Sequence, residues 1–542
     1  MYLNFSDIPG HQNLFLDYLH EFENVSKFYE RNFKSQETYG SFFELLSKRE
    51  KPHREKLTEI IRQQYSNQKL SKQTQFNIEA LNSNKTVAVV TGQQLGLLGG
   101  PLYTVYKTLT AIKLCNYLKE KFDDYHFVPV FWLEGDDHDY DEVRVANILN
   151  NENQVLELKY SDGLEEETNR GSVAELKFNH NLTSVFDSLQ NSLRDTEFKS
   201  SIISFYKLFY SEKKTFLEAF RELMIKLFDE FGLVVFNPVF PAVKQLLRPI
   251  FANEITNYIN HTGFLVERSA ELEELYHAQV KVKPINLFYL ENNERLLIEP
   301  VEKEYRLKGK RKKFTQEELL HQIEHSPEKF SPNVLLRPIC QDFLFPTAFY
   351  VGGPSEVSYF AQISPLYKIY KIDQPYIYPR SSATIVEKGA KTVLEKYSLG
   401  YHSLFTTEEE MISKIVAANS ELNLEELFTK TSESISEILD KLSADLSNVD
   451  RSLPEISGKT KLKIEEAINL LKNKATEAEK KKYDITIRQL SKVRNLLYPN
   501  TNLQERELNF IYFANKYGLD IIKWIYNELS INKFEHQILE LP

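Results

Sequence analysis

The chain has 542 residues, a mass of 63.5 kDa and a formal net charge of −10. At roughly 150 residues per domain, this length predicts three to four domains. The 36 Phe and 30 Tyr exclude a chain that is disordered throughout. The acidic balance argues against a protein whose main partner is nucleic acid. The two cysteines, Cys115 and Cys340, cannot form a disulfide framework and fit a reducing compartment.

No segment has the composition of a membrane span. The longest apolar run, residues 127–133, is far shorter than the ~18 residues that a spanning helix needs. Residues 1–12 contain neither a basic segment nor an apolar one, so no signal peptide is expected. The sequence therefore predicts a cytoplasmic protein that does not contact membranes.

The most regular pattern begins at residue 86. A β-branched segment over residues 86–92 ends at a glycine and predicts a strand. Apolar residues at every third or fourth position predict a helix over residues 102–122, and the near-continuous apolar run at 127–133 predicts a strand covered on both faces. Strand, glycine-rich loop, helix and strand make a βαβ unit, whose two strands are parallel.

Further strands and helices alternate along the chain. Helices are predicted over residues 11–35, 53–82, 197–231, 341–350 and 355–370 and from 384, and strands at residues 233–236, 335–336 and 376–378. Asn292 and Asn293 predict the turn of a hairpin, Thr315 and Glu318 predict a capped helix start, and residues 161–172 predict an exposed loop. This alternation predicts an α/β fold with a mostly parallel, Rossmann-like sheet.

The pattern changes beyond residue 400. Apolar residues in the segments 408–448 and 459–497 recur at intervals of three and four, and a turn at residues 450–454 separates the two. Two helices of roughly 40 residues, about 60 Å long at 1.5 Å per residue, predict an antiparallel coiled-coil hairpin. Because one hairpin has a single apolar seam, its remaining apolar positions predict a homodimer that forms through this arm.

The predicted organisation has three parts. They are an α/β core over residues 1–395 with inserted segments at about 150–195 and 265–330, a helical arm over residues 396–500, and C-terminal helices over residues 501–542 that pack back on the core.

The loops after the predicted strands are the candidate site, because ligands bind at the carboxyl ends of strands in open α/β sheets. The first loop is rich in glycine, which lets backbone amides approach a phosphate. It matches neither the P-loop nor the dinucleotide pattern, and a tight strand-to-helix connection is the alternative. The substrate- or nucleotide-binding candidates here are Gly92, Gln93, Gln94, Gly96, Gly100 and Tyr103.

The second loop, residues 134–141, carries five acids and a histidine in eight positions. Acids this close repel one another unless they bind a cation, activate a nucleophile or titrate together. The alternative is a helix N-terminus, which also favours acids. We expect Asp137, His138 and Asp139 to be catalytic, in amine recognition or as a general base, and Asp136 to bind substrate. No residue is assigned to a metal.

Two later loops complete the candidate site. Arg337 is suited to hold a carboxylate or phosphate through two parallel hydrogen bonds, and Arg380 and Ser381 follow a predicted strand. The alternatives are a buried ion pair and a helix N-cap. Further binding candidates are Gln341, Gly353, Pro354, Glu356 and Tyr359. Cys340 has no histidine in a recognisable pairing and is expected in the core.

Four segments in this order resemble one family, the bacillithiol biosynthesis cysteine-adding enzymes, and the resemblance spans essentially the whole chain. The segments are TGQQLGLLGGPLYTVYK, VPVFWLEGDDHDYDEV, LRPICQDFLFPTAFYVGGPSEVSYF and YIYPRSSATIVE. The resemblance implies a ligase that adds L-cysteine to glucosaminyl-malate by amide bond formation, with ATP, and magnesium beside it, activating a carboxylate. It also implies a core similar to class I aminoacyl-tRNA synthetases and nucleotidyltransferases, with a coiled-coil arm that makes a dimer.

The resemblance also implies roles for the candidate residues. Asp137 or His138 would take the proton of the attacking amine. The glycine-rich loop and Arg380 would hold phosphate or the malyl carboxylate, and Arg337 would hold a second carboxylate. The His-x-Gly-His element and the Lys-rich Ser loop of class I enzymes are absent from this sequence.

Two other functions stay open. One is a scaffold that binds a partner through the arm and keeps a nucleotide-binding core without turnover; the mutually repelling acids argue against it. The other is a tRNA-aminoacylating enzyme, which needs a basic surface for RNA. Residues 391–542 carry 21 Lys and Arg against 24 Asp and Glu, which disfavours that function.

Overall fold

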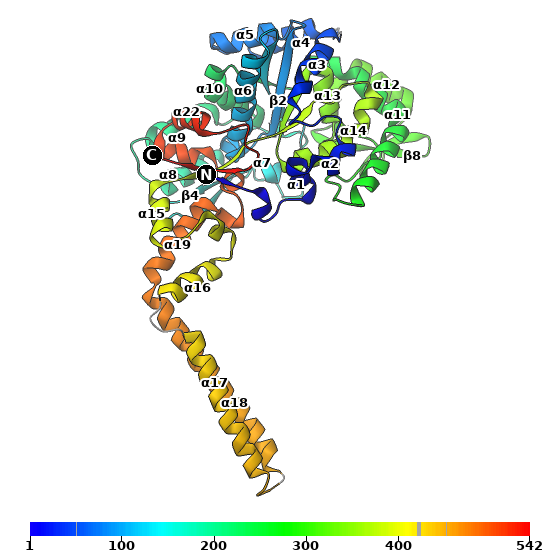
Figure 1. The fold of residues 1–542 in the computed structure, drawn as a ribbon. Helices are drawn as coiled ribbons and strands as arrows, with labels where there is room; N and C mark the ends of the chain where they lie inside the picture. The colour runs from blue at the N-terminus through cyan, green and yellow to red at the C-terminus, as the bar shows by residue number, and fades with distance from the viewer. Residues whose placement is uncertain (50, 52, 420–423, 451) are drawn as a thin grey trace. The chain divides into compact units, whose positions relative to one another are not determined.

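The structure is a computed structural model that describes residues 1–49, 51, 53–419, 424–450 and 452–542 (Figure 1). The chain divides into two compact units. The first contains Met1–Ile385 and Asn502–Leu539, and the second contains Val386–Thr501 and Glu540–Pro542. Among the described residues, no helix is both long enough and apolar enough to cross a membrane.

A five-stranded sheet forms the centre of the first unit. Its order is β13 (Tyr376–Pro379), β12 (Thr347–Gly352), β2 (Thr86–Gln94), β3 (His126–Glu134) and β6 (Val234–Phe236). All four neighbouring pairs are parallel. Helix α6 (Tyr103–Lys121) connects β2 to β3, so the predicted βαβ unit and the Rossmann-like α/β fold are confirmed. Strand β2 runs to Gln94, two residues beyond the predicted end, and takes Gln93 and Gln94 out of the loop.

A second sheet of five antiparallel strands belongs to the same unit. Its order is β10 (Lys313–Phe314), β9 (Glu304–Leu307), β8 (Glu294–Val301), β7 (Leu287–Glu291) and β11 (Phe330–Pro332). The predicted hairpin is confirmed: Asn292 and Asn293 both have positive φ, 52° and 61°, as its tight turn requires. The predicted capping box is also present, where Thr315 and Glu318 open α12 (Gln316–His325).

The strand predicted at residues 335–336 is wrong, and the helix predicted at 341–350 is confirmed only as far as Leu344. Leu335 and Leu336 donate their amides to Asn333 Oδ1, each at 3.0 Å, and so begin α13 (Arg337–Leu344). The segment after this helix is β12, whose apolar and aromatic residues are buried on both faces. A short apolar run covered on both sides carries no period that separates strand from helix.

Several predicted helices differ in extent. The range 11–35 contains only α1 (Asn13–His20) and α2 (Phe22–Val25), and 53–82 divides into α4 (Arg54–Gln64) and α5 (Lys72–Ala80). The range 197–231 breaks where Thr215 caps a new helix, giving α9 (Lys199–Phe209) and α10 (Phe216–Phe228). The helix predicted from residue 384 begins later, because β14 (Ser382–Val386) precedes α15 (Lys388–Lys396).

One long helix escaped prediction. α11 (Pro241–Glu273) contains Pro249, which interrupts the expected pattern. It packs against α12 and α14 (Pro354–Tyr370). The remaining elements of this unit are β1 (Tyr2–Leu3), α3 (Tyr39–Lys48), α7 (Tyr140–Val143), β4 (Val145–Leu149), β5 (Val155–Lys159), α8 (Leu182–Ser192), α20 (Gln504–Glu507), α21 (Phe510–Tyr517), α22 (Ile521–Glu528) and β15 (His536–Glu540).

The second unit contains the predicted helical hairpin. Helices α17 (Leu424–Leu446) and α18 (Leu453–Lys482) lie side by side in Figure 1. Lys461 pairs with Asp440 and Lys472 pairs with Glu425, so rising numbers on one helix meet falling numbers on the other, and the hairpin is antiparallel. Helices α16 (Glu408–Asn419) and α19 (Asp484–Leu497) flank it.

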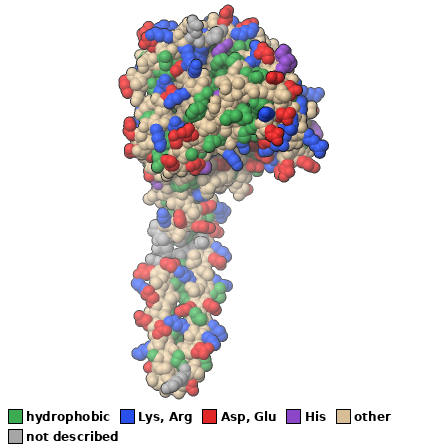
Figure 2. Space-filling model, turned by 90° about the vertical axis from the view of Figure 1, so that its right-hand side faces the viewer, with side chains coloured by type: hydrophobic (Ala, Val, Ile, Leu, Met, Phe, Trp, Pro, Cys, Tyr) green, Lys and Arg blue, Asp and Glu red, His purple; other side chains and the backbone are tan. Residues whose placement is uncertain are grey.

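The hairpin leaves apolar side chains exposed. Figure 2 shows them among charged side chains along the arm. The exposed residues include Ile438, Leu442, Val449, Ile456, Leu462, Leu470 and Leu471. That a second copy of the chain covers them stays a prediction.

The C-terminal part of the first unit packs on the glycine-rich loop through Asn509. Its side-chain amide donates to the carbonyls of Leu98 and Gly100 at 3.1 and 2.7 Å. Its Oδ1 accepts from the Ile511 amide at 2.9 Å and so caps α21. Because Asn509 is 1% exposed, water cannot replace these bonds.

We predict that Asn509→Ala lowers the free energy of unfolding by about 1–3 kcal/mol, because buried carbonyls and a helix start lose their partner. Chemical denaturation followed by circular dichroism measures the change. The control is Asn84→Ala, at an exposed turn. Equal stability of the two variants would show that this side chain does not hold the loop.

Candidate active site

A cavity of about 500 Å³ lies at the carboxyl ends of β2, β3 and β12, the edge where the sequence predicted a site. Most predicted site residues line it. They are Gly92, Gln93, Gln94, Tyr103, Asp136, Asp137, His138, Arg337, Gly353, Pro354, Glu356, Tyr359 and Arg380. The fold therefore brings together four segments that are far apart in the sequence.

Five predicted site residues lie outside this cavity. Gly96 and Gly100 line an adjoining cavity of about 300 Å³. Asp139 caps α7, where its Oδ1 accepts from the Glu142 amide at 3.1 Å. Gln341 is buried and accepts from Arg337 at 2.9 Å, and the Ser381 hydroxyl donates to the Ser530 carbonyl at 2.8 Å.

Three glycine amides of the glycine-rich loop are hydrogen-bonded within the loop itself. The Gly96 amide donates to the Gln94 carbonyl, the Gly99 amide to the Gly96 carbonyl and the Gly100 amide to the Leu97 carbonyl. A Cβ on Gly96 would lie 2.7 Å from Gly100 Cα. The glycines here serve close backbone packing, which fits the tight-connection alternative, and whether the loop binds a phosphate stays a prediction.

Arg337 is the centre of a buried polar cluster. Its Nε lies 2.9 Å from Glu134 Oε1, and one of its terminal nitrogens donates to the hydroxyls of both Tyr359, at 2.6 Å, and Tyr350, at 3.2 Å. The Tyr350 hydroxyl in turn donates to Glu356 at 2.5 Å. The first turn of α13 therefore holds a guanidinium group at the ends of β3 and β12.

Lys107 of α6 closes the other side of the cluster. Its ammonium lies 2.5 Å from Glu356 Oε2 and donates to the Gly92 carbonyl and the Gln93 side chain at 3.0 and 2.9 Å. Burial alone would raise the pKa of Glu356, but Lys107 and the Gly353 amide hold that pKa below its ordinary value. Burial lowers the pKa of Lys107.

The acidic loop resolves its charge repulsion through individual partners. Asp136 accepts from Lys244 of α11 at 2.6 Å, in a pair that is almost fully buried. Asp137 accepts from Gln94 at 2.5 Å and from the His138 amide at 2.7 Å. Among the described residues, no group of three or more His, Cys, Asp and Glu side chains is arranged to hold a metal ion.

His138 is held as a neutral imidazole. Arg295 NH1 lies 2.8 Å from His138 Nδ1, and because a guanidinium only donates, Nδ1 accepts and the ring proton lies on Nε2. Burial and the Arg295 charge lower the pKa of His138. Its only lone pair is thus engaged, so this arrangement suits a hydrogen-bond donor to substrate rather than the predicted general base.

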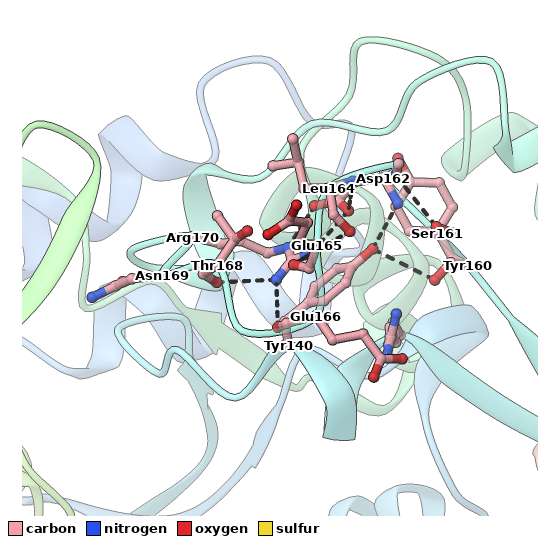
Figure 3. A network of polar contacts seen from close by, with 12 residues as sticks. Tyr140, Tyr160, Ser161, Asp162, Leu164, Glu165, Glu166, Thr168, Asn169 and Arg170 are labelled. Carbon is pink, nitrogen blue, oxygen red and sulfur yellow. Dashed lines mark hydrogen bonds and ion pairs between the residues drawn. The ribbon is translucent and has the colours of Figure 1, made fainter.

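The loop of residues 161–172 supports the acidic loop that carries Asp137. Arg170, 7% exposed, pairs with Asp162 and donates to the carbonyls of Glu165 and Thr168, as Figure 3 shows. Residues 161–169 lie largely at the surface, as predicted for this loop, and the Arg170 side chain ties the loop together from its buried side. Just beyond Arg170, the Val173 amide donates to the Asp137 carbonyl at 2.8 Å. The loop thereby supports the acidic motif from outside.

Two carboxyls in the cavity have raised pKa values. Burial raises the pKa of Glu134 to about 7, and the neighbouring acids add to this effect while Arg337 opposes it. Burial also raises the pKa of Glu142, which lines both cavities. Such shifts are typical of acid–base groups at functional sites.

Several cavity residues were not predicted. The most informative are Lys107, Glu134, Glu142, Arg295, Tyr350 and Arg506. Lys107, Glu134, Glu142 and Tyr350 lie within the four recognised segments, and Glu134 ends β3, so its position at a strand end could have suggested it. Arg295 reaches the cavity from the antiparallel sheet and Arg506 from beyond the arm, and no sequence signal links either to the other loops.

Fold and cavity together define a Rossmann-like α/β protein whose site lies at the carboxyl edge of a parallel sheet. A family model described as bacillithiol biosynthesis BshC, N-terminal Rossmann-like domain, matches residues 1–381, and the C-terminal coiled-coil domain model of BshC matches residues 383–541. The chain belongs to the BshC family of bacillithiol biosynthesis, as the resemblance predicted.

Individual relatives are similar in sequence to this chain over nearly its full length. Proteins named "Putative cysteine ligase BshC" are 35% identical in Salinibacter ruber and 33% identical in Chloroherpeton thalassium, each covering 97% of this chain and 96% of the relative. A solved structure whose title names an arginyl-tRNA synthetase from Campylobacter jejuni covers 84% of this chain and 98% of its own, at 9% identity and a TM-score of 0.23. A score this low carries no argument.

We predict that Arg295→Met raises the pKa of His138, because a facing cation is lost while Asp137 and Asp139 remain. Titration of the histidine ring protons by NMR measures the shift, with the His138 signal assigned from its absence in His138→Gln. Arg306→Met, an exposed arginine of β9 in the same sheet, is the control and should leave the signal unchanged. A His138 pKa that stays constant or falls in Arg295→Met would contradict the assigned hydrogen bond.

Proposed function

We propose that this chain is a ligase that forms an amide bond between the carboxyl group of L-cysteine and the amino group of glucosaminyl-malate, with ATP activating the carboxyl group. The observation that carries the proposal is the charge of the cavity. Seven Lys and Arg line it against five Asp and Glu, in a chain with a net charge of −10. A locally cationic site suits substrates that bring carboxylates and phosphates.

The cations are of two kinds. Arg337, Lys107 and Arg380 are buried and paired with Glu134, Glu356 and Glu505. The others are Arg295, Lys281, Lys283 and Arg506, for which no ion pair with a carboxylate was found among the described residues. The second kind is available for an incoming anion, and its number fits a substrate set of a malyl group, an amino acid carboxylate and a nucleotide.

Buried Arg295 is the strongest candidate for a substrate carboxylate. Its guanidinium stacks 3.8 Å above the Phe288 ring and donates to Ser331 at 2.9 Å and the Pro332 carbonyl at 2.8 Å. Burial lowers its pKa, and the nearby acids only partly offset that effect. A carboxylate in the cavity would supply the missing counter-charge, so binding gains a charge-assisted hydrogen bond in a site of low dielectric.

The same geometry suits an activated acyl group. ATP supplies a phosphate leaving group on the carboxyl oxygen, which turns a carboxylate into an acyl donor. The protein must then orient the donor and the amine and keep water away. Trp132, Phe288 and Val334 give the cavity apolar walls, and the His138 Nε2 proton is a donor for an oxygen of the acyl group.

The direct test is mass spectrometry of a reaction that contains the purified full chain, glucosaminyl-malate, cysteine, ATP and magnesium, with each component omitted in turn. We expect a product whose mass equals the sum of the two substrates less one water, and only when all organic components are present. Product without ATP would contradict the proposed activation. No product under any condition would contradict the ligase function.

We predict that Arg506→Ala raises the KM for an anionic substrate about 10- to 100-fold, with little change in stability. The lost interaction is a hydrogen bond from a charged group, worth about 1.5–3 kcal/mol. The Arg506 side chain is exposed, and within the described part of the chain no hydrogen bond or ion pair of its guanidinium was found. Steady-state kinetics with each substrate varied measures the effect. Arg194→Ala, exposed and in neither cavity, is the control. Unchanged KM values for all substrates would exclude Arg506 from binding.

A further inference from the structure

We propose that Glu134 is the general base that takes the proton of the attacking amine. The inference rests on the proposed ligase function and names a residue and a role that go beyond it. Glu134 is the last residue of β3, at the carboxyl edge of the sheet, and it lines the cavity directly.

The geometry leaves one oxygen of Glu134 open to the cavity. Oε1 pairs with Arg337 Nε at 2.9 Å, whereas no hydrogen bond to Oε2 was found among the described residues. The side chain retains 23% of its exposure, so the carboxylate is not sealed in the core. Gly92 packs closely against the end of the same strand, because a Cβ there would lie 2.8 Å from the Trp132 carbonyl.

Three other acids of the cavity are bound to neighbouring groups. Asp136 is bound by Lys244, both oxygens of Asp137 accept hydrogen bonds, and Glu356 receives three donors. His138 has no free lone pair while Arg295 holds Nδ1. Among the described residues that line the cavity, Glu142 is the carboxyl that competes for this role, because Asp136 is only 9% exposed and held by Lys244. Glu142 lies where the two cavities meet.

The charges around Glu134 suit a proton acceptor that works near neutral pH. Those that face it are Arg337 on α13, Arg295 on β8, Asp136 and Asp137 on its own loop, Glu356 on α14, and the hydroxyls of Tyr350 and Tyr359. Burial and the facing acids raise its pKa to about 7. A base is most effective when its pKa lies close to the working pH.

The proton balance of the step is complete. The substrate ammonium gives one proton to Glu134 Oε2, and its nitrogen then bonds to the activated carbonyl carbon. The second proton passes to water as the C–O bond to phosphate breaks and the electron pair leaves with the phosphate. Glu134 later releases the proton to solvent. No oxidant or further reactant is needed.

The test compares two nucleophiles in the wild type and in Glu134→Gln. Glucosaminyl-malate needs a base, whereas hydroxylamine is largely unprotonated at neutral pH and traps an activated cysteine as its hydroxamate without one. We expect Glu134→Gln to slow amide formation roughly 10²- to 10⁴-fold, the usual contribution of a general base. We expect the rate of hydroxamate formation to change less than about threefold.

The pH profile gives a second readout. In the wild type, the rate of amide formation should fall as the pH drops below about 7, because Glu134 becomes protonated. Glu134→Gln should lose this inflection and keep only that of the amine itself. Glu157→Gln, on the exposed face of β5, removes the same charge elsewhere and is the matched control.

Each remaining outcome is decisive. Loss of both reactions in Glu134→Gln would show a role in binding or activation and overturn the proposal. Retained amide formation in Glu134→Gln, with the loss found in Glu142→Gln instead, would transfer the role to Glu142. If the wild type forms neither product nor hydroxamate, the ligase function itself fails, and this result is distinct from both others.

Discussion

The ion pair between Arg337 and Glu134 is the interaction around which the candidate site is organised. It joins the end of β3 to the first turn of α13, and through Tyr350 and Glu356 it extends to Lys107 on α6. The buried Arg337 guanidinium needs a partner for its charge, and Glu134 supplies it. The three elements are therefore held in one arrangement by the same groups that face the ligand.

The sequence predicted the parts of the fold whose signal is local and long. The βαβ unit from β2 to β3 was predicted because the spacing of apolar residues there is regular. The hairpin was predicted because its tight turn needs residues that tolerate positive φ, and Asn292 and Asn293 do. Strand β12 was mistaken for a helix, since an apolar run buried on both faces has no period. α11 was missed because Pro249 interrupts it.

The candidate site divides in the same way. Residues that directly follow a strand, such as Asp136 and Arg380, could be predicted because topology alone places them at one edge. Arg295 could not be predicted, because it comes from another sheet and its guanidinium is held by Ser331 and the Pro332 carbonyl. The sequence also could not predict the hydrogen-bond partners of the acidic residues. The motif Asp136–Asp139 suggested a catalytic cluster, but most of its carboxylates are bound by Lys244, by Gln94 or at the start of a helix.

The site thus separates fixed from exchangeable charge. Pairs such as Asp136–Lys244 and Arg380–Glu505 are sealed, so a ligand gains nothing by displacing either partner. Arg506 and Lys281 are exposed, and their charges cost little to bring to an anion. Glu134 and Arg295 lie between these extremes, since each is largely desolvated and only partly compensated. The protonation and hydrogen bonding of such partly compensated groups change most when a charged substrate binds. We therefore place the chemistry at Glu134 and Arg295.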